Sequence, residues 1–222
     1  MDEPQQTPTT GQAAPEVLGD VRRLSESERK AYIDVALARA KKVMANLHHG
    51  KALYAAFEPM LKFVVGTQYF GGCHDTSALM YMRLLRAGLP KDNVALCIGE
   101  VVGPGGPFDH SWVEVNGKVL DVAICAPNES GKFAGGPVFG GIDLGSNTEP
   151  KCRFGVSSGS PLEPDAAMVY SMNLREYQKF QVSSGHKPMI KLARDLYGLD
   201  GKALLATYAK VKRTWRNPAL NP

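Results

Sequence analysis

Three residues in the middle of the chain have the side chains of a cysteine-dependent nucleophilic site. Cys73 follows two glycines, His110 lies in the run Phe-Asp-His-Ser-Trp-Val-Glu-Val, and Asp121 ends the run Gly-Lys-Val-Leu-Asp. A thiolate can attack a carbonyl carbon, an imidazole can carry the thiol proton, and a carboxylate can orient the imidazole. Because three such residues occur together in many chains by chance, the prediction depends on the elements that carry them.

The sequence around Cys73 predicts the start of a helix. Apolar residues recur about one turn apart over 73–87, and Gly88 supplies a stop signal. Gly71 and Gly72 allow the backbone to turn sharply into this helix. The partial positive charge at a helix N-terminus and a nearby imidazolium both favour a thiolate, so they lower the pKa of a thiol placed there. Cys73 is therefore the predicted nucleophile.

An Asn-Gly pair at 116–117, between two alternating runs, predicts a β-hairpin that carries the other two residues. With a two-residue turn, Trp112 faces Asp121 and His110 faces Ala123. His110 and Asp121 are then diagonal neighbours on one face of the sheet, about 7 to 8 Å apart at their α-carbons. An imidazole and a carboxylate can form a hydrogen bond over that separation, with the carboxylate orienting the ring.

The tetrahedral intermediate of such a reaction needs hydrogen-bond donors for its oxyanion. We expect the backbone N–H of Cys73 to be one donor and the side-chain amide of Gln68 to be the second. Gly72 and Trp112 are the candidate substrate-binding residues, although Trp112 shares the predicted sheet face of His110 and packing is its simpler role.

These features together resemble a known family. A cysteine that opens a helix, the run His110-Ser-Trp-Val-Glu-Val, a short turn and Leu120-Asp121 resemble the transglutaminase-like branch of the papain-like cysteine enzymes, over about residues 66–125. The central part is especially similar to the small bacterial transglutaminase-like peptidases. The resemblance implies an α+β fold, with the catalytic helix packed on an antiparallel sheet and further helices at both ends of the chain. Gln68 resembles in position the oxyanion glutamine of papain-like enzymes.

Members of this branch hydrolyse peptides, deamidate glutamine or transfer an acyl group to an amine. The resemblance therefore implies a thiol-dependent enzyme that acts on a protein or peptide amide through a thioester. Cys73 would be the nucleophile, His110 the general base and then acid, and Asp121 the residue that orients the imidazole. We expect no metal or organic cofactor. Whether water or an amine accepts the acyl group stays open, as do the target and the oligomeric state.

Other interpretations of the same residues stay open. The chain could be an acyltransferase that loads Cys73 from an acyl thioester, as arylamine acetyltransferases do, or a non-catalytic binding module in which Cys73 is only packed. A zinc site built from Cys73, His74, His110 and Cys125 is disfavoured, because the chain has no Cys-x-x-Cys or His-x-x-x-His pair. His74 adjoins the thiol and is expected on the surface of the helix.

The elements that precede the thiol helix are predicted from capping and periodicity. Residues 1–20 have almost no large apolar side chain and are predicted to be a disordered tail, so 21–222 forms the single domain. A first helix starts after Ser25, which forms a capping box with Glu28. A second, shorter helix is predicted over 52–64.

The elements that surround and follow the hairpin are less regular. Residues 94–102 predict a buried strand, and 126–164 predict a long Gly-, Pro- and Ser-rich loop that either covers the substrate or is a poorly ordered insertion. A last strand is predicted over 168–172. Three helices are predicted after it, over 174–180, 187–197 and 202–215.

The composition excludes several classes of protein. The 222 residues include 44% hydrophobic and 22% charged residues, which is ordinary for a globular protein. The net charge of +4 is spread along the chain apart from the run 210–216, so no nucleic-acid partner is expected. No apolar run approaches the roughly 20 residues needed to cross a bilayer, and the N-terminus has no secretory signal pattern. We expect no membrane partner, and a location in the cytoplasm or delivery by a secretion system that leaves no signal peptide.

Overall fold

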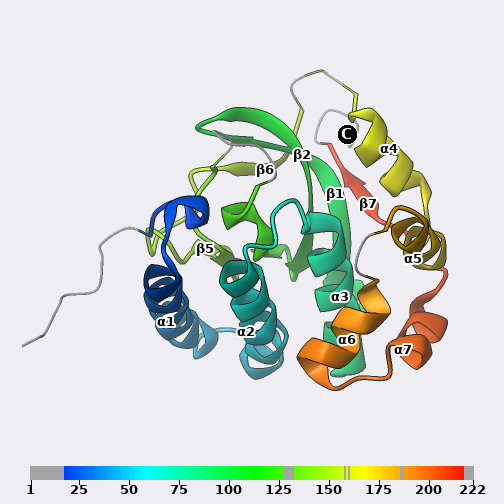
Figure 1. Cartoon of the computed structure of the whole chain (residues 1–222), viewed down its shortest axis with the longest axis horizontal. Helices are drawn as coiled ribbons and strands as arrows, with labels where there is room; N and C mark the ends of the chain where they lie inside the picture. The colour runs from blue at the N-terminus through cyan, green and yellow to red at the C-terminus, as the bar shows by residue number, and fades with distance from the viewer. Residues whose placement is uncertain (1–17, 128–132, 158, 160, 186–187, 218–222) are drawn as a thin grey trace, which may run out of the picture.

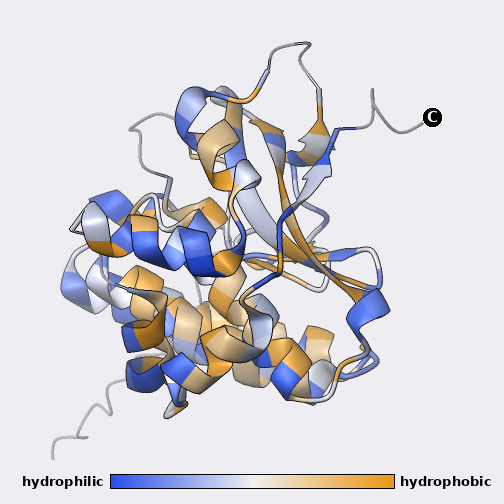
Figure 2. Cartoon of the chain, turned by 90° about the vertical axis from the view of Figure 1, so that its right-hand side faces the viewer, coloured by the Kyte–Doolittle hydropathy of each residue, from blue (hydrophilic) through white to orange (hydrophobic). Residues whose placement is uncertain are grey.

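The computed structural model describes residues 18–127, 133–157, 159, 161–185 and 188–217. In these residues a group of helices packs on a five-stranded mixed sheet, which confirms the predicted α+β class (Figure 1). Figure 2 shows that apolar residues gather where the helices meet one another and the sheet, whereas polar residues cover the outer faces of the helices.

The first three helices of the fold agree with the predictions. Helix α1 (Glu26–Met44) begins with the expected capping box, in which the Glu28 N–H donates to Ser25 Oγ at 3.3 Å and the Ser25 N–H donates to Glu28 Oε2 at 2.7 Å. Helix α2 (Gly50–Thr67) is longer than predicted at both ends. Helix α3 (Cys73–Arg86) starts at the predicted nucleophile and packs against the two central strands.

The sheet is built around the predicted hairpin. Strands β1 (Val94–Gly103), β2 (Gly106–Val115) and β3 (Lys118–Leu120) are antiparallel neighbours, β6 (Arg153–Val156) pairs with the free edge of β1, and β7 (Thr214–Arg216) pairs with β1 in parallel. Asn116 and Gly117 both have positive φ, of 50° and 73°, as a type I′ turn requires. The register of the hairpin is therefore the predicted one as far as β3 extends, with Val115 opposite Lys118.

The two faces of the sheet bury different sets of residues. One face contributes Leu96, Ile98 and Val113 to a large core shared with the helices. The other face contributes Cys97, Val101 and Trp112 to a smaller core, which is closed by residues of the segment after the hairpin. Burial of both faces explains why β1 is an almost continuous apolar run.

The segment 126–164 is not one open loop, so that prediction is wrong for the part that the structure describes. It contains the short strands β4 (Val138–Phe139) and β5 (Ile142–Asp143) as well as β6. The buried carboxylate of Asp143 accepts the backbone N–H groups of three residues, Gly136, Gly145 and Ser146. These bonds organise a compact turn that the glycine content alone does not reveal. Residues 128–132, 158 and 160 lie outside the described chain.

The C-terminal part departs from the predictions twice. The strand predicted over 168–172 is part of helix α4 (Pro164–Ser171), which has proline at its first position, where proline is well tolerated. Helices α5 (Leu174–Ser183) and α6 (Met189–Tyr197) are close to their predicted ranges. Helix α7 (Gly201–Tyr208) is shorter than predicted, because the chain then leaves the helix and forms β7.

Residues 1–17 of the predicted tail lie outside the described residues. Leu18, which falls within the predicted tail, is buried, and its N–H donates to the carbonyl of Gly145. Among the described residues, no helix combines the length and apolar character that a membrane span needs.

Candidate active site

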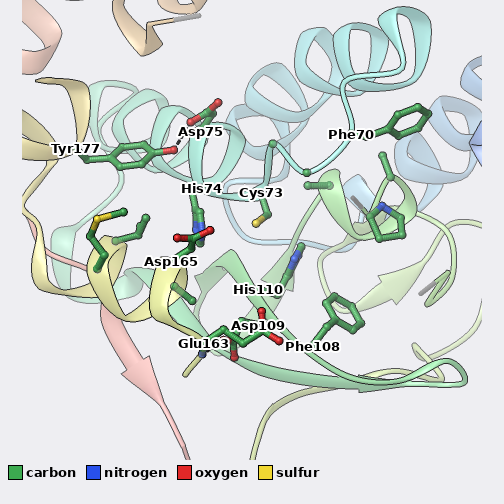
Figure 3. Close-up of a pocket in the computed structure, with 18 of the residues that line it drawn as sticks. Phe70, Cys73, His74, Asp75, Phe108, Asp109, His110, Glu163, Asp165 and Tyr177 are labelled. Atoms are coloured by element: carbon green, nitrogen blue, oxygen red, sulfur yellow. Dashed lines mark hydrogen bonds between the residues drawn. The ribbon is translucent and has the colours of Figure 1, made fainter. Parts of the chain in front are cut away.

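A pocket of about 480 Å³ lies where the N-terminus of α3 faces β2 and α4. Cys73 and His110 both line it, and Figure 3 shows the Cys73 sulfur pointing toward the His110 ring. The predicted thiol and imidazole are therefore brought together in a cavity that a ligand can enter.

The position of Cys73 depends on the glycines before it. Gly71 has a φ of 69°, and a Cβ at Gly72 would lie 2.2 Å from the ring of Tyr69. Any larger residue at 72 would require the Tyr69 ring to move, and the hydroxyl of that ring donates to Asp75 in the first turn of the helix. Gly72 also lines the pocket, as expected of a candidate substrate-binding residue.

The predicted contact between His110 and Asp121 is confirmed. The Nε2 atom of His110 lies 2.6 Å from Oδ2 of Asp121, and both side chains are buried. The other carboxylate oxygen accepts the Ala123 N–H at 2.8 Å. With Nε2 committed to the carboxylate, Nδ1 is the ring nitrogen left to exchange a proton with the thiol.

The backbone holds Asp121 by a different arrangement from the one predicted. Strand β3 ends at Leu120, and the N–H and carbonyl of Asp121 pair instead with Val138, at 2.8 and 2.7 Å. The predicted pairing of His110 with Ala123 is not formed, because Ala123 begins a short 3₁₀ helix (Ala123–Cys125). The segment after the hairpin, rather than a longer hairpin, fixes the carboxylate.

The thiol of Cys73 has a different electrostatic environment from that of the other cysteines. Burial is the largest cause that raises the pKa of Cys97, Cys125 and Cys152, each to about 12, and nearby carboxylates act in the same direction. Burial also acts to raise the pKa of Cys73, but the charge and hydrogen bonding of the His74 and His110 rings outweigh it, and hold that pKa well below its ordinary value. Cys73 is therefore the cysteine of the four that favours the thiolate.

The imidazole of His110 is shifted in the complementary direction. Burial opposes its charge, but the carboxylate of Asp121 and the thiolate of Cys73 raise its pKa from 6.5 to about 10. The two shifts, downward for the thiol and upward for the imidazole, favour a thiolate beside an imidazolium. This is the charge state that a cysteine nucleophile requires.

Two predicted site residues lie elsewhere. Gln68 is the C-terminal cap of α2 in a left-handed conformation, its amide points to the carbonyl of Val21 at 3.5 Å, and it does not line the pocket. Trp112 is fully buried in the core beneath His110, where the two rings are stacked 6.5 Å apart. The oxyanion assignment of Gln68 and the substrate-binding assignment of Trp112 are therefore not supported by their positions.

His74 is part of the site, although it was expected on the surface of the helix. It lines the pocket beside the thiol (Figure 3). Its Nδ1 lies 2.7 Å from the hydroxyl oxygen of the buried Ser111. One feature of the sequence pointed to this contact. Successive residues of a strand face opposite sides of the sheet, so Ser111 faces the helices whereas His110 faces the other side.

A buried carboxylate near the thiol was also missed. Asp75 accepts hydrogen bonds from the hydroxyls of Tyr69 and Tyr177 and from the amide of Gln181. Burial raises the pKa of Asp75, and the bonds from Tyr177 and Tyr69 act against that rise. These contacts link the first turn of α3 to α5, whose position in space could not be predicted from the sequence.

The pocket wall is acidic on the side of α4. Asp109, Glu163 and Asp165 line it together with Asp75, and no lysine or arginine does so among the described residues (Figure 3). Carboxylates that line a pocket of this size favour neutral or cationic ligands over anionic ones.

The described residues contain no group of three or more histidine, cysteine, aspartate or glutamate side chains placed to hold a metal ion. No protein-family model, curated protein or solved structure matches the chain. The function is therefore argued from the geometry and charge of the pocket.

Proposed function

We propose that the chain is a thiol-dependent enzyme that acts on protein or peptide amides through a Cys73 thioester. The observation that carries the proposal is the placement of Cys73 at the start of α3, in one pocket with His110, whose far nitrogen is held by the buried Asp121 carboxylate. The lowered pKa of the Cys73 thiol agrees with this geometry. A cysteine with only a packing role would have a raised thiol pKa, as Cys97 and Cys125 have. The contrast argues against a binding module that uses the same fold.

In the first half-reaction the Cys73 thiolate attacks the amide carbon and forms a carbon–sulfur bond. The carbonyl electron pair moves to oxygen and gives a tetrahedral oxyanion. When the intermediate collapses, the carbon–nitrogen bond breaks and His110 gives its proton to the departing amine. Asp121 keeps the ring oriented and stabilises its charge.

In the second half-reaction the neutral His110 takes a proton from water or from an acceptor amine as that nucleophile attacks the thioester. The carbon–sulfur bond then breaks and the Cys73 thiolate is restored beside the imidazolium. Hydrolysis, deamidation and acyl transfer to an amine share this sequence and differ in the leaving group and the acceptor.

The arrangement of the elements supports the finer assignment to a transglutaminase-like or papain-like architecture. A helix that begins at the thiol packs against antiparallel strands, one of which carries the histidine, and the carboxylate comes directly after the end of the next strand. Two residues that carry this resemblance, Cys73 and His110, line the pocket, and a third, Asp121, holds the His110 ring.

The charge of the pocket favours an amide substrate over the alternative acyl thioester. A coenzyme A thioester would bring phosphate groups toward Asp109, Glu163 and Asp165, with no lysine or arginine among the described lining residues to receive them. An amide substrate whose neighbouring groups are neutral or basic is not repelled by these carboxylates.

The proposal is tested by incubating the protein with unfolded β-casein and a fluorescent primary amine, and measuring the masses of the products. Incorporated amine indicates transfer, conversion of glutamine to glutamate indicates deamidation, and shorter fragments indicate peptide hydrolysis. The proposal expects at least one of these, lost in Cys73→Ala and retained in Cys152→Ala, which removes a buried thiol outside the pocket. Products that persist in Cys73→Ala would show that the chemistry does not use this thiol.

A further inference from the structure

The oxyanion of the proposed reaction needs a second donor besides the backbone N–H of Cys73, and Gln68 does not supply it. Among the described residues that line the pocket, five side chains carry an N–H or O–H group: Tyr69, His74, His110, Tyr177 and Gln181. Three of these direct that group to Asp75, and His110 is committed to proton transfer. His74 is the donor that remains.

The orientation of His74 is fixed from two sides. Its Nδ1 lies 2.7 Å from Ser111 Oγ, and its backbone carbonyl accepts a hydrogen bond from Arg213 Nη2 at 3.0 Å. Both Ser111 and Arg213 are buried, at 0% and 3% exposure, so these contacts are shielded from water. If the Ser111 hydroxyl donates to Nδ1, the ring carries its proton on Nε2.

Nε2 is then a donor held in the pocket beside the sulfur. The His74 ring already lies within hydrogen-bonding reach of the Cys73 sulfur and lines the same pocket. As the thiolate attacks, negative charge leaves the sulfur and builds on the carbonyl oxygen, which is two bonds from the sulfur in the tetrahedral intermediate. A donor beside the sulfur can therefore donate a hydrogen bond to this oxygen as it becomes negatively charged.

We propose that His74 is a catalytic residue whose Nε2–H forms the oxyanion hole together with the backbone N–H of Cys73, and that Ser111 is its positioning residue. The inference rests on the proposed function. His74 keeps its proton throughout, while His110 carries the proton that moves from the thiol to the leaving group. The two imidazoles on either side of the sulfur therefore have separate roles.

The test compares two reactions of the same thiol. Acylation by p-nitrophenyl acetate passes through an oxyanion, whereas alkylation by iodoacetamide displaces iodide and forms none. Both rates are measured for Cys73 at about pH 9, so that the loss of one imidazole changes the thiolate fraction little. Removal of an oxyanion donor slows acyl transfer by about 10²- to 10³-fold.

We expect His74→Ala to slow acylation by about 10²-fold while alkylation stays within a few-fold, and His74→Gln, which keeps an N–H donor, to recover part of the acylation rate. Ser111→Ala should lower the same ratio of acylation to alkylation to a smaller extent, and Ser111→Thr should restore it. His48→Ala, which removes an exposed histidine, is the matched control. Thermal unfolding of each variant shows that the fold is intact.

Three results would overturn the inference. If His74→Ala acylates as fast as the unchanged protein, the oxyanion has another donor. If it slows acylation and alkylation equally, His74 acts on the thiolate rather than on the oxyanion. If Ser111→Ala leaves the ratio unchanged while His74→Ala lowers it, the positioning role of Ser111 is wrong. A different result, in which the unchanged protein forms no acyl-Cys73 at all, contradicts the proposed function itself.

Discussion

The His110 ring and the Asp121 carboxylate are buried together, at 4% and 1% exposure, with Nε2 of the ring 2.6 Å from Oδ2 of the carboxylate. A buried carboxylate needs a compensating positive charge or hydrogen bonds, and in this pair each partner stabilises the charge of the other. The pair fixes which ring nitrogen is free to serve the thiol.

The first prediction distinguishes two effects of Asp121 on His110, namely orientation of the ring and stabilisation of its positive charge. Asp121→Ala should lower the pKa of His110, because burial alone opposes the charged ring, and should reduce acylation of Cys73 by about 10³-fold. Asp121→Asn keeps an oxygen that accepts the Nε2–H but removes the charge, so it should recover part of the rate without restoring the pKa. The pKa is measured from the pH profile of acylation and by NMR of the imidazole. If Asp121→Ala leaves both the rate and the pKa unchanged, Asp121 does not orient the ring.

The second prediction concerns the pH dependence of alkylation. The folded pKa of Cys73 is lowered, so the thiolate forms as pH rises through that low value, and the imidazolium persists until pH approaches the raised His110 pKa of about 10. The rate with iodoacetamide should therefore reach its plateau well below pH 9. In His110→Ala the thiol should ionise at a higher pH. A wild-type profile that rises only near the ordinary thiol pKa of 9.0 would contradict the ion pair.

The same pKa shift predicts the direction of the effect on stability. The pKa of His110 is higher in the folded protein than its usual 6.5, so its contribution to the free energy of unfolding is complete below about pH 6.5. That contribution declines as pH rises toward about 10. Urea unfolding of the unchanged protein and of His110→Gln, measured across this range, should converge as pH rises. If the difference in the free energy of unfolding between the two proteins stays constant with pH, the charge of His110 does not stabilise the fold.

The third prediction follows from the acidic wall. Acylation by cationic peptide esters should be faster than acylation by otherwise identical anionic ones, and the difference should shrink as salt is added. Asp165→Asn should reduce the preference by a few-fold, since Asp165 is exposed and lines the pocket. Glu58→Gln, on the outer side of α2 and paired with Lys62, is the matched control. Equal rates for the two esters would show that the wall does not select substrate charge.

Much of the site could be predicted because its key signals are local. A glycine-led helix start at Cys73 and an Asn-Gly turn with alternating flanks each depend on only a few neighbouring residues, and both are present in the structure. From the turn it could be predicted that His110 and Asp121 lie close together. The turn did not predict that the backbone of Asp121 pairs with Val138.

The parts that could not be predicted depend on contacts between distant segments. Gln68 had a suitable spacing from Cys73, but the left-handed turn at the end of α2 points its amide to Val21. The roles of His74 and Asp75 depend on Ser111 and on helix α5, which are far from them along the chain. The apolar run 168–172 was too short for its periodicity to separate strand from helix.

The fourth prediction tests the network around Asp75. Tyr177→Phe keeps the ring beneath the Arg213 guanidinium but removes one of the hydrogen bonds to the buried carboxylate. The free energy of unfolding should fall by about 1 to 3 kcal/mol, measured by urea denaturation. Tyr170→Phe, whose ring packs edge-on against Trp215, is the control and should change it less. Equal losses in the two variants would show that the bond to Asp75 adds no stability.

The proposed function depends on activation of the Cys73 thiol by the fold. The most direct measurement is the second-order rate of iodoacetamide with Cys73 at pH 7, determined by peptide mass analysis for the native protein, for His110→Ala and for the protein unfolded in urea. The thiolate–imidazolium pair predicts that native Cys73 reacts at least about tenfold faster than unfolded Cys73, and that His110→Ala loses most of the difference. A native rate no higher than the unfolded rate, in a pocket that remains open to the reagent, would contradict the account.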